Sequence, residues 1–421
     1  MMTALINCDV LVAGGGSAGM AAAVSAAKSG ARTLLVERYG FLGGMGTAAL
    51  VHTLCGLYLI REEQGAVFAN PGFASQFAQR LQSMKGAHEA VRMGRLDVLP
   101  HDPWAMAVLA DEVTAECKDL QVLLHTELIA ACGQDGAWEV DVMSRGQLMR
   151  IRAKALVDTS GDAVLTHLLQ APSMMENGGH LQRPAYIVKL AGVNAEASSE
   201  TGRLRLAHGI TRAVKEGDLP VECLGAGVRG GVNVGECFIT IDLAAGGGDY
   251  DPLDAGLLTR MERLGRTTAT HLQRWMKGNV EGFADSWIVA WPVRAGVRES
   301  RRMSGCYELT AEDVLKGRGF EDGIANIAWP IELREKATGP RWQFPEAGCA
   351  AQIPLAALRS QKYASLFAAG RCFSATHEAL ASVRVMGTCM ATGEAAGMAA
   401  VHWDKGELEI LHRIQQGRAS F

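Results

Sequence analysis

Residues 8 to 46 read CDVLVAGGGSAGMAAAVSAAKSGARTLLVERYGFLGGMG, and this stretch decides the fold. An apolar run at 10–13 leads into Gly14, Gly16 and Gly19, at the spacing G-x-G-x-x-G. Small residues at 17–28 are typical of a tightly packed helix, and a second apolar run at 33–36 ends at Glu37. Strand, glycine turn, helix, strand and acid in this order predict a βαβ unit that binds a dinucleotide.

The glycines of this turn have separate roles. Gly14 permits the tight turn, Gly16 lets the backbone approach a pyrophosphate, and Gly19 lets the helix lie close to the sheet. The pyrophosphate is expected at the helix N-terminus, where free N–H groups and the helix dipole favour an anion. Glu37 can accept hydrogen bonds from ribose hydroxyls and would repel a 2′-phosphate. The stretch therefore predicts FAD or NAD rather than NADP.

Composition narrows the class of protein. The chain has 421 residues, of which 48% are hydrophobic and 20% charged, so two or three domains with a large core are expected. A net charge of −4 gives no sign of nucleic-acid or anionic-membrane binding. No apolar stretch reaches the roughly 20 residues of a membrane span, and no signal peptide is recognisable, so a soluble cytoplasmic protein is expected. The ten cysteines form no C-x-x-C pair, which argues against a metal centre or an iron–sulfur cluster.

The rest of the chain supplies further elements. Residues 102–118 predict a helix capped by Asp102, with Trp104, Val108, Leu109 and Val113 close to one face. Strands are predicted within 122–132, 138–143 and 149–162, the last running into a second glycine turn. The middle of the chain predicts strands at 186–193 and 237–243 and a long helix at 254–276. The chain then predicts a short buried strand at 366–370 and a small-residue helix at 387–401. Both are similar in composition to the strand and helix of the opening stretch.

These elements predict an α/β fold with two domains. Residues 1–173 and 350–421 would form a Rossmann-like nucleotide domain, and residues 174–349 an inserted α+β substrate domain. A second G-x-G-x-x-G occurs at Gly225, Gly227 and Gly230. The residues after it alternate like a strand, which favours a loop or hairpin over a second nucleotide site.

Three segments resemble the FAD-dependent oxidoreductases related to fumarate reductase and succinate dehydrogenase flavoproteins. They are the opening stretch, VDTSGDAVL at 157–165, and FAAGRCFSATHEALASVRVMGTCMATGEAAGMAA at 367–400. The resemblance implies a glutathione-reductase-like FAD domain, with FAD extended across it and the isoalloxazine at the interface with the inserted domain. His52-Thr53 echoes the covalent flavin linkage of some relatives, but its surroundings do not match. Non-covalent FAD is therefore expected.

The resemblance also implies which residues contact FAD. They are Gly14, Gly16, Ser17, Ala18, Gly19, Glu37, Arg38, Gly43, Gly44, Met45, Ser160, Gly161, Asp162, Gly370, Arg371, Gly387, Thr388 and Cys389. Gly387, Thr388 and Cys389 are expected to direct backbone N–H groups at the pyrimidine edge of the flavin, where negative charge collects on reduction. Arg371 stands where relatives often carry Glu, and could pair with a phosphate.

The polar stretch 375–384 holds the candidate catalytic residues. His377 and Glu378 could handle a proton, and Arg384, which keeps the family's distance to the last helix, could fix an anionic group of the substrate. The alternative is an internal hydrogen-bond network that holds the loop. Weaker candidates for binding a carboxylate, or for interdomain salt bridges, are Tyr186, Arg298, Arg301 and Arg302.

The leading hypothesis is an oxidoreductase that moves a hydride between a small organic substrate and flavin N5. Oxidation or reduction at CH–CH or CH–OH is favoured, and amine oxidation at CH–NH is the runner-up. A flavoprotein subunit that passes electrons to a partner protein is the second hypothesis, because no internal electron acceptor is visible. The sequence does not identify the electron acceptor. A homo-oligomer is compatible with the sequence. A dehydrogenase that uses only NAD is disfavoured, because the strand at 366–370 and the helix at 387–401 add a distant C-terminal part to the nucleotide domain.

Overall fold

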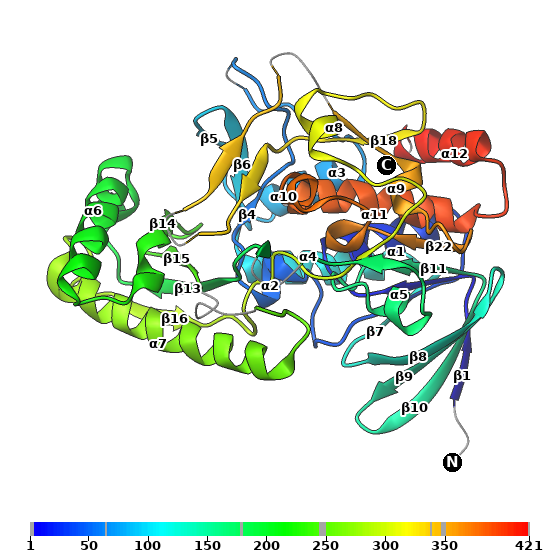
Figure 1. Cartoon of the computed structure of the whole chain (residues 1–421), viewed down its shortest axis with the longest axis horizontal. Helices are drawn as coiled ribbons and strands as arrows, with labels where there is room; N and C mark the ends of the chain where they lie inside the picture. The colour runs from blue at the N-terminus through cyan, green and yellow to red at the C-terminus, as the bar shows by residue number, and fades with distance from the viewer. Residues whose placement is uncertain are drawn as a thin grey trace.

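A five-stranded parallel sheet forms the centre of the computed structural model, which describes residues 4–63, 65–176, 180–243, 250–336, 339–346 and 351–419. The strand order is β22-β11-β2-β3-β7 (Figure 1). The strands are β2 (Val10–Ala13), β3 (Thr33–Val36), β7 (Leu120–Leu123), β11 (Ala155–Asp158) and β22 (Leu366–Ala368). Every residue of β2, β3, β11 and β22 is buried, as expected of parallel strands covered on both faces.

Helices α1 (Ser17–Lys28) and α11 (Met386–Val401) pack side by side with their backbones almost in contact. A Cβ added to Gly393 would lie 2.0 Å from the carbonyl oxygen of Ala18, and one on Gly397 would lie 2.1 Å from that of Ala22. Only glycine permits this approach. The first and last parts of the nucleotide fold are therefore joined through small residues.

Helix α4 (Pro103–Ala115) begins as the sequence predicts, since the Asp102 carboxylate accepts from the N–H groups of Trp104 and Ala105. The predicted face is only half right. Leu109 and Val113 are buried, but Trp104 and Val108 are 56% and 50% exposed. Positions four apart share a helix face, so 104 and 108 lie together on the solvent side while 109 and 113 point inward.

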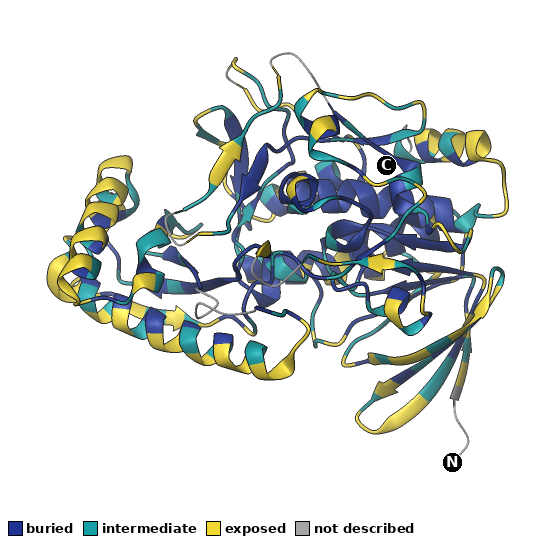
Figure 2. Ribbon diagram, viewed as in Figure 1, coloured by how far each residue is buried: buried dark blue, intermediate teal, exposed yellow. Residues whose placement is uncertain are grey.

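A second sheet flanks the nucleotide sheet, in the order β1-β10-β9-β8. It is a meander of β8 (Glu127–Gln134), β9 (Ala137–Ser144) and β10 (Gln147–Ala153), with β1 (Ala4–Asn7) added in parallel to β10. Figure 2 shows it as a largely exposed layer at the side of the molecule. The prediction of a strand at 138–143 is confirmed by β9. The stretches 122–132 and 149–162 each divide between two strands of different sheets: the first reaches from the end of β7 into β8, and the second from β10 into β11.

A four-stranded antiparallel sheet forms the centre of the inserted segment. Its order is β14 (Gly227–Gly230), β15 (Cys237–Asp242), β13 (Ala185–Ala191) and β16 (Trp287–Ala290). Helices α6 (Glu200–Glu216) and α7 (Ala255–Asn279) lie along the outer side (Figure 1). The Gly225–Gly230 stretch ends in β14, which pairs antiparallel with β15, so the prediction of a hairpin there is confirmed.

Two hydrophobic cores show how the predicted domains are built. Buried residues between Leu181 and Ala295 form one core of their own. After it come β17 (Arg302–Met303), α8 (Ala311–Leu315), β18 (Gly323–Asn326) and β19 (Ile331–Leu333), whose buried side chains join the core of the nucleotide sheet. Segments before residue 349 thus share the core of the nucleotide sheet. The boundary at 349–350 lies outside the described residues, and the exact division stays a prediction.

The remaining helices and strands are shorter or peripheral. They are α2 (Met45–Ala48), β4 (Thr53–Leu54), α3 (Phe73–Ser83), β5 (Val91–Met93), β6 (Leu96–Pro100), α5 (Val164–Leu168), β12 (Ser173–Met174), η2 (Ala195–Ser198), η3 (Val221–Gly225), β20 (Arg341–Gln343), β21 (Gln352–Pro354), α9 (Leu355–Leu358), η4 (Gly370–Cys372), α10 (His377–Val383) and α12 (Glu407–Ala419). Within the described part of the chain, no helix combines the length and the apolarity that a membrane crossing requires.

Candidate cofactor and active site

A cavity of about 300 Å³ lies at the carboxyl ends of β2, β11 and β22, where open parallel sheets bind ligands. Its lining comes from four separate parts of the chain, within residues 14–48, 126–164 and 369–389 and at Arg294. The predicted cofactor residues that line it are Gly14, Gly16, Ser17, Ala18, Glu37, Arg38, Gly44, Met45, Ser160, Gly161, Gly370, Arg371 and Cys389. The predicted residues Gly19, Gly43, Asp162, Gly387 and Thr388 lie outside this lining.

The first glycine turn is tight on one side and open on the other. Gly14 has a φ of +105°, and a Cβ there would lie 2.7 Å from the carbonyl oxygen of Thr159. The Thr159 hydroxyl donates to the carbonyl oxygens of Ala13 and Gly14 at 3.0 and 2.7 Å. A Cβ on Gly16, in contrast, would meet only the Cα of Gly44, at 3.8 Å. The backbone at Gly16 is therefore accessible from the cavity.

The loop before α2 lies against this turn. The N–H of Gly43 donates to the carbonyl oxygen of Gly15 at 2.9 Å, and Gly44, with a φ of +58°, borders the cavity. The start of α1 carries no side-chain cap. Its first N–H groups, at Ser17 and Ala18, are thus available to an anion in the cavity.

Glu37 lies at the end of β3 and is only 7% exposed. One carboxylate oxygen accepts from the N–H of Gly15 at 2.6 Å, and the other accepts from the N–H of Tyr39 at 2.9 Å. Each carboxylate oxygen has room for a further donor. Glu37 can therefore hold the turn in place and still accept from ribose hydroxyls.

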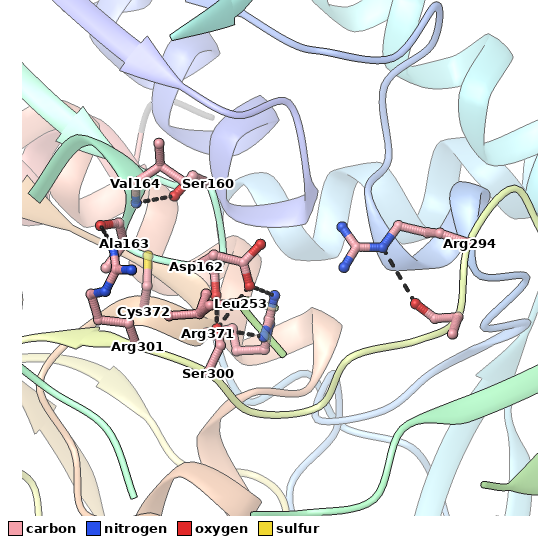
Figure 3. A network of polar contacts seen from close by, with 12 residues as sticks. Ser160, Asp162, Ala163, Val164, Leu253, Arg294, Ser300, Arg301, Arg371 and Cys372 are labelled. Carbon is pink, nitrogen blue, oxygen red and sulfur yellow. Dashed lines mark hydrogen bonds and ion pairs between the residues drawn. The ribbon is translucent and has the colours of Figure 1, made fainter. Parts of the chain in front are cut away.

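Asp162, Arg371 and Ser300 form a network beneath the cavity (Figure 3). Arg371 donates to Asp162 at 2.8 Å and to the Ser300 hydroxyl at 2.9 Å, and Ser300 donates to Asp162 at 2.7 Å. Burial disfavours the charged carboxylate, but Arg371 and Arg294 outweigh it and lower the pKa of Asp162 to about 2. Arg371 is thus paired with a carboxylate, whereas the sequence suggested a phosphate as its partner.

The start of α11 differs from expectation. The N–H of Gly387 donates to the carbonyl oxygen of Cys55, and that of Cys389 donates to the carbonyl oxygen of Val385, both at 2.9 Å. These two amides therefore do not point at the cavity, because the loop at Cys55 covers the helix start. Thr388 is fully buried, and its hydroxyl oxygen has no hydrogen-bond partner. Cys389 still borders the cavity.

Arg384 lies at the end of α10 and lines the same cavity. One terminal nitrogen donates to the side-chain oxygen of Gln182 at 3.0 Å and to the carbonyl oxygen of Glu332 at 3.4 Å, while Nε is buried without a partner. No carboxylate among the described residues lies within ion-pair distance of its guanidinium. Burial and the neighbouring Arg298 lower the pKa of Arg384 to about 10, so it remains cationic at neutral pH.

The weaker arginine candidates have internal partners. Arg298 forms a 2.7 Å ion pair with the fully buried Asp242, and Arg302 forms a 2.6 Å pair with Glu299. Among the described residues, Arg301 has one hydrogen-bond partner, the carbonyl oxygen of Ala163, at 3.5 Å. Tyr186 is 1% exposed on β13. The structure brings none of these four residues to the lining of the cavity.

His377 and Glu378 also lie outside the cavity lining. The buried His377 ring lies between two carboxylates, with Nδ1 2.7 Å from Glu299 and Nε2 3.2 Å from Glu335. Glu378 is exposed in the first turn of α10. Glu299 also accepts from the side-chain nitrogen of Gln182, at 3.5 Å. His377 is thus linked to Arg384 through Glu299 and Gln182. This internal hydrogen-bond network is the alternative to a catalytic role that the sequence also allowed.

The His377 pairing predicts a pH-dependent stability. Burial lowers the pKa of this imidazole, but Glu299 and Glu335 outweigh burial and raise it above its ordinary value. A raised folded-state pKa contributes stability that is complete below about pH 6.5 and is lost as the pH rises through the folded value. We expect the urea midpoint to fall between pH 6 and pH 9, and His377→Gln to remove most of that slope. The exposed His208→Gln should keep it; an unchanged slope in His377→Gln would refute the assignment.

Several cavity residues are not among those predicted from the sequence. They are Val36, Tyr39, Ala48, Thr126, Glu127, Leu128, Thr159, Val164, Arg294, Ala369 and Met386. Tyr39 follows Glu37 by two residues and was within reach of the motif argument. Arg294 stands in the stretch WPVRAG, which has no recognisable spacing.

The residues present fit an extended dinucleotide. The accessible backbone at Gly16, the uncapped start of α1 and the carboxylate of Glu37 provide for pyrophosphate and ribose. Fold and site together define a dinucleotide-binding α/β protein with an inserted segment against its ligand cavity.

A family comparison names the cofactor. The model of the FAD dependent oxidoreductase family matches residues 9–416, and the chain belongs to this family.

Individual relatives are more distant. The thiamine thiazole synthase of Aeropyrum pernix is 32% identical over 181 residues, which are 41% of this chain and 61% of the relative, so the chain spans about three fifths of that protein. Among solved structures, p-nitrophenol 4-monooxygenase from Pseudomonas putida shares 11% identity, with 98% of this chain and 84% of that one covered and a TM-score of 0.49. A geranylgeranyl bacteriochlorophyll reductase-like protein from Thermoplasma acidophilum shares 14%, with 99% and 83% covered and a TM-score of 0.43.

Proposed function

We propose that the protein transfers a hydride between flavin N5 and a small organic substrate with an anionic group, which Arg384 holds. The observation that carries the proposal is the state of Arg384 in the cavity. Its guanidinium faces an amide and a carbonyl oxygen instead of a carboxylate, and Nε lacks a partner. A cation held away from water in this way gains most from an anionic ligand.

The surroundings of Arg384 prepare it for this role. Gln182 presents its oxygen to Arg384 because its nitrogen faces Glu299, which His377 and Arg302 hold in turn. His377 is on this basis a positioning residue. Bound FAD supplies hydride acceptance and donation at N5. The chain's own contribution is to bind and orient the substrate beside it.

The bond that reacts is proposed to be CH–CH or CH–OH; the resemblance of the closing motif to fumarate reductase and succinate dehydrogenase flavoproteins supports CH–CH. Amine oxidation is less favoured, because Arg384 would repel an ammonium group. The alternative of a subunit that passes electrons to a partner protein makes a different prediction, since it would show no turnover on its own.

The test is reduction of the bound flavin by a substrate panel. We expect small hydroxy acids or saturated carboxylic acids to bleach the visible flavin band of the purified protein under anaerobic conditions, and their neutral esters to do so far more slowly. Turnover with oxygen or a dye would separate an independent enzyme from an electron-passing subunit. Bleaching by amines alone, or equal rates with acids and esters, would overturn the proposal.

We also propose that FAD is held non-covalently, in a cytoplasmic enzyme. His52 is buried and its ring stacks on Phe238, with centroids 4.1 Å apart, outside the cavity lining. Nine cysteines of the described chain are free thiols, which suits a reducing compartment. Acid precipitation should accordingly release the flavin into the supernatant.

A further inference from the structure

Arg294 is a residue of the inserted segment that reaches the nucleotide cavity. It follows β16, and its neighbour Ala295 is buried in the separate core of the inserted segment. The N–H groups of Val293 and Arg294 donate to the carbonyl oxygen of Ala48, at 2.7 and 3.2 Å. These hydrogen bonds join the segment after β16 to the end of α2. The Arg294 side chain lines the same cavity as Gly16 and Ser17, at the start of α1.

Four arginines line the cavity, and three of them have other roles. Arg371 is paired with Asp162, and Arg38 lies 3.9 Å from the same carboxylate. Arg384 contacts Gln182 and the backbone of Glu332. Arg294 donates through Nε to the carbonyl oxygen of Ala295 at 3.3 Å, and no described carboxylate lies within 4.0 Å of its guanidinium. Arg294 and Arg384 are therefore the two cavity arginines without a described carboxylate within 4.0 Å, and Arg384 is already proposed to hold the substrate.

Arg294 shares the cavity lining with Ser160 and Gly161 of the second glycine turn. Figure 3 shows the terminal nitrogens of Arg294 directed toward the side on which Asp162 and Arg371 lie. The charge of Asp162 is already shared by Arg371 and Ser300. Burial lowers the pKa of Arg294, but Asp162 and Tyr39 outweigh it and raise the pKa, so the guanidinium stays charged. A partly buried cation in this position is expected to face a bound anion.

We propose that Arg294 binds a phosphate of the FAD pyrophosphate, so that the cofactor itself joins the inserted segment to the nucleotide domain. The phosphates are the only groups of oxidised FAD that are anionic at neutral pH. A guanidinium binds them through paired N–H groups. The α1 N-terminus supplies N–H donors but only a partial charge, and Arg294 adds a full charge from a separate part of the chain.

The test compares two flavins that differ in their phosphates. Full-length protein, stripped of flavin, is titrated with FAD and with riboflavin, which has no phosphate. We expect Arg294→Gln to raise the Kd for FAD about 10- to 100-fold and to change the Kd for riboflavin less than about twofold. Riboflavin binding also reports whether the variant is folded. Equal losses for both flavins, or an unchanged Kd for FAD, would overturn the proposal.

Two further variants sharpen the result. Arg294→Lys keeps the charge without the planar fork and should recover part of the FAD affinity. Arg301→Gln removes an arginine that contacts the carbonyl oxygen of Ala163 outside the cavity lining, and it should leave the preference for FAD over riboflavin unchanged. Added salt should reduce that preference more in the wild type than in Arg294→Gln. A steeper or equal salt effect in the variant would count against a phosphate contact.

Discussion

Gly397→Ala is expected to destabilise the folded protein by about 3 kcal/mol, at the upper end of the usual cost of an overpacked core. The added Cβ would lie 2.1 Å from the carbonyl oxygen of Ala22, and this atom belongs to backbone that cannot rotate away. Helix α1 would have to move from α11, and the glycine turn at its start would move with it. Denaturant unfolding of the holoprotein, followed by circular dichroism, measures the effect.

Gly278→Ala is the matched control, since Gly278 also lies in a helix, α7, and a Cβ there would meet no atom within 4 Å. Because alanine is the better helix former, this variant should be more stable by up to about 1 kcal/mol. The two substitutions are chemically identical and should act in opposite directions. Equal effects would mean that the close approach of α1 and α11 does not determine stability.

Arg384→Gln is expected to lower kcat/KM for an acidic substrate roughly 100- to 1,000-fold, or about 3–4 kcal/mol. The variant keeps a hydrogen-bonding group of similar reach but removes the charge that the structure leaves uncompensated. Arg384→Lys should recover part of the loss, because it restores charge without the fork. Stopped-flow bleaching of the flavin band measures the rate directly, and the same band shows that FAD is retained.

The control for Arg384 is an exposed arginine with a carboxylate partner. Arg341 is 61% exposed and lies 3.6 Å from Glu335, so Arg341→Gln should have little effect on the rate. The neutral ester of the substrate provides the second control. A loss with the ester as large as that with the acid would show that Arg384 stabilises the cavity but does not recognise an anionic group.

The nucleotide fold could be predicted from the sequence because its physical constraints are local. Gly14 needs a positive φ, and the buried strands must be continuously apolar, so both leave direct marks in the chain. Helix α4 shows the limit of that argument. Its start was readable from Asp102, but its apolar residues cover more than one face, and only packing decides that Trp104 is outside.

The catalytic side was predictable only in part. Arg384 could be placed by its distance to the last helix, and the structure does bring it to the cavity. The positions of His377 and Glu378 depend on the direction of a short helix, and the pairing of His377 depends on partners 78 and 42 residues away along the chain, at Glu299 and Glu335. Arg294 could not be found at all, because its position depends on the way the inserted segment folds back.

The order of the strands in the central sheet has a consequence for biosynthesis. Strand β2, helix α1 and strand β3 lie near the start of the chain, but the edge strand β22 and helix α11, on which α1 packs, follow only after residue 365. A nascent chain therefore carries the glycine turn long before it can complete the cavity. We expect flavin capture to follow translation, and the uncovered α1 surface to be the point at which an unfinished chain is most prone to aggregate.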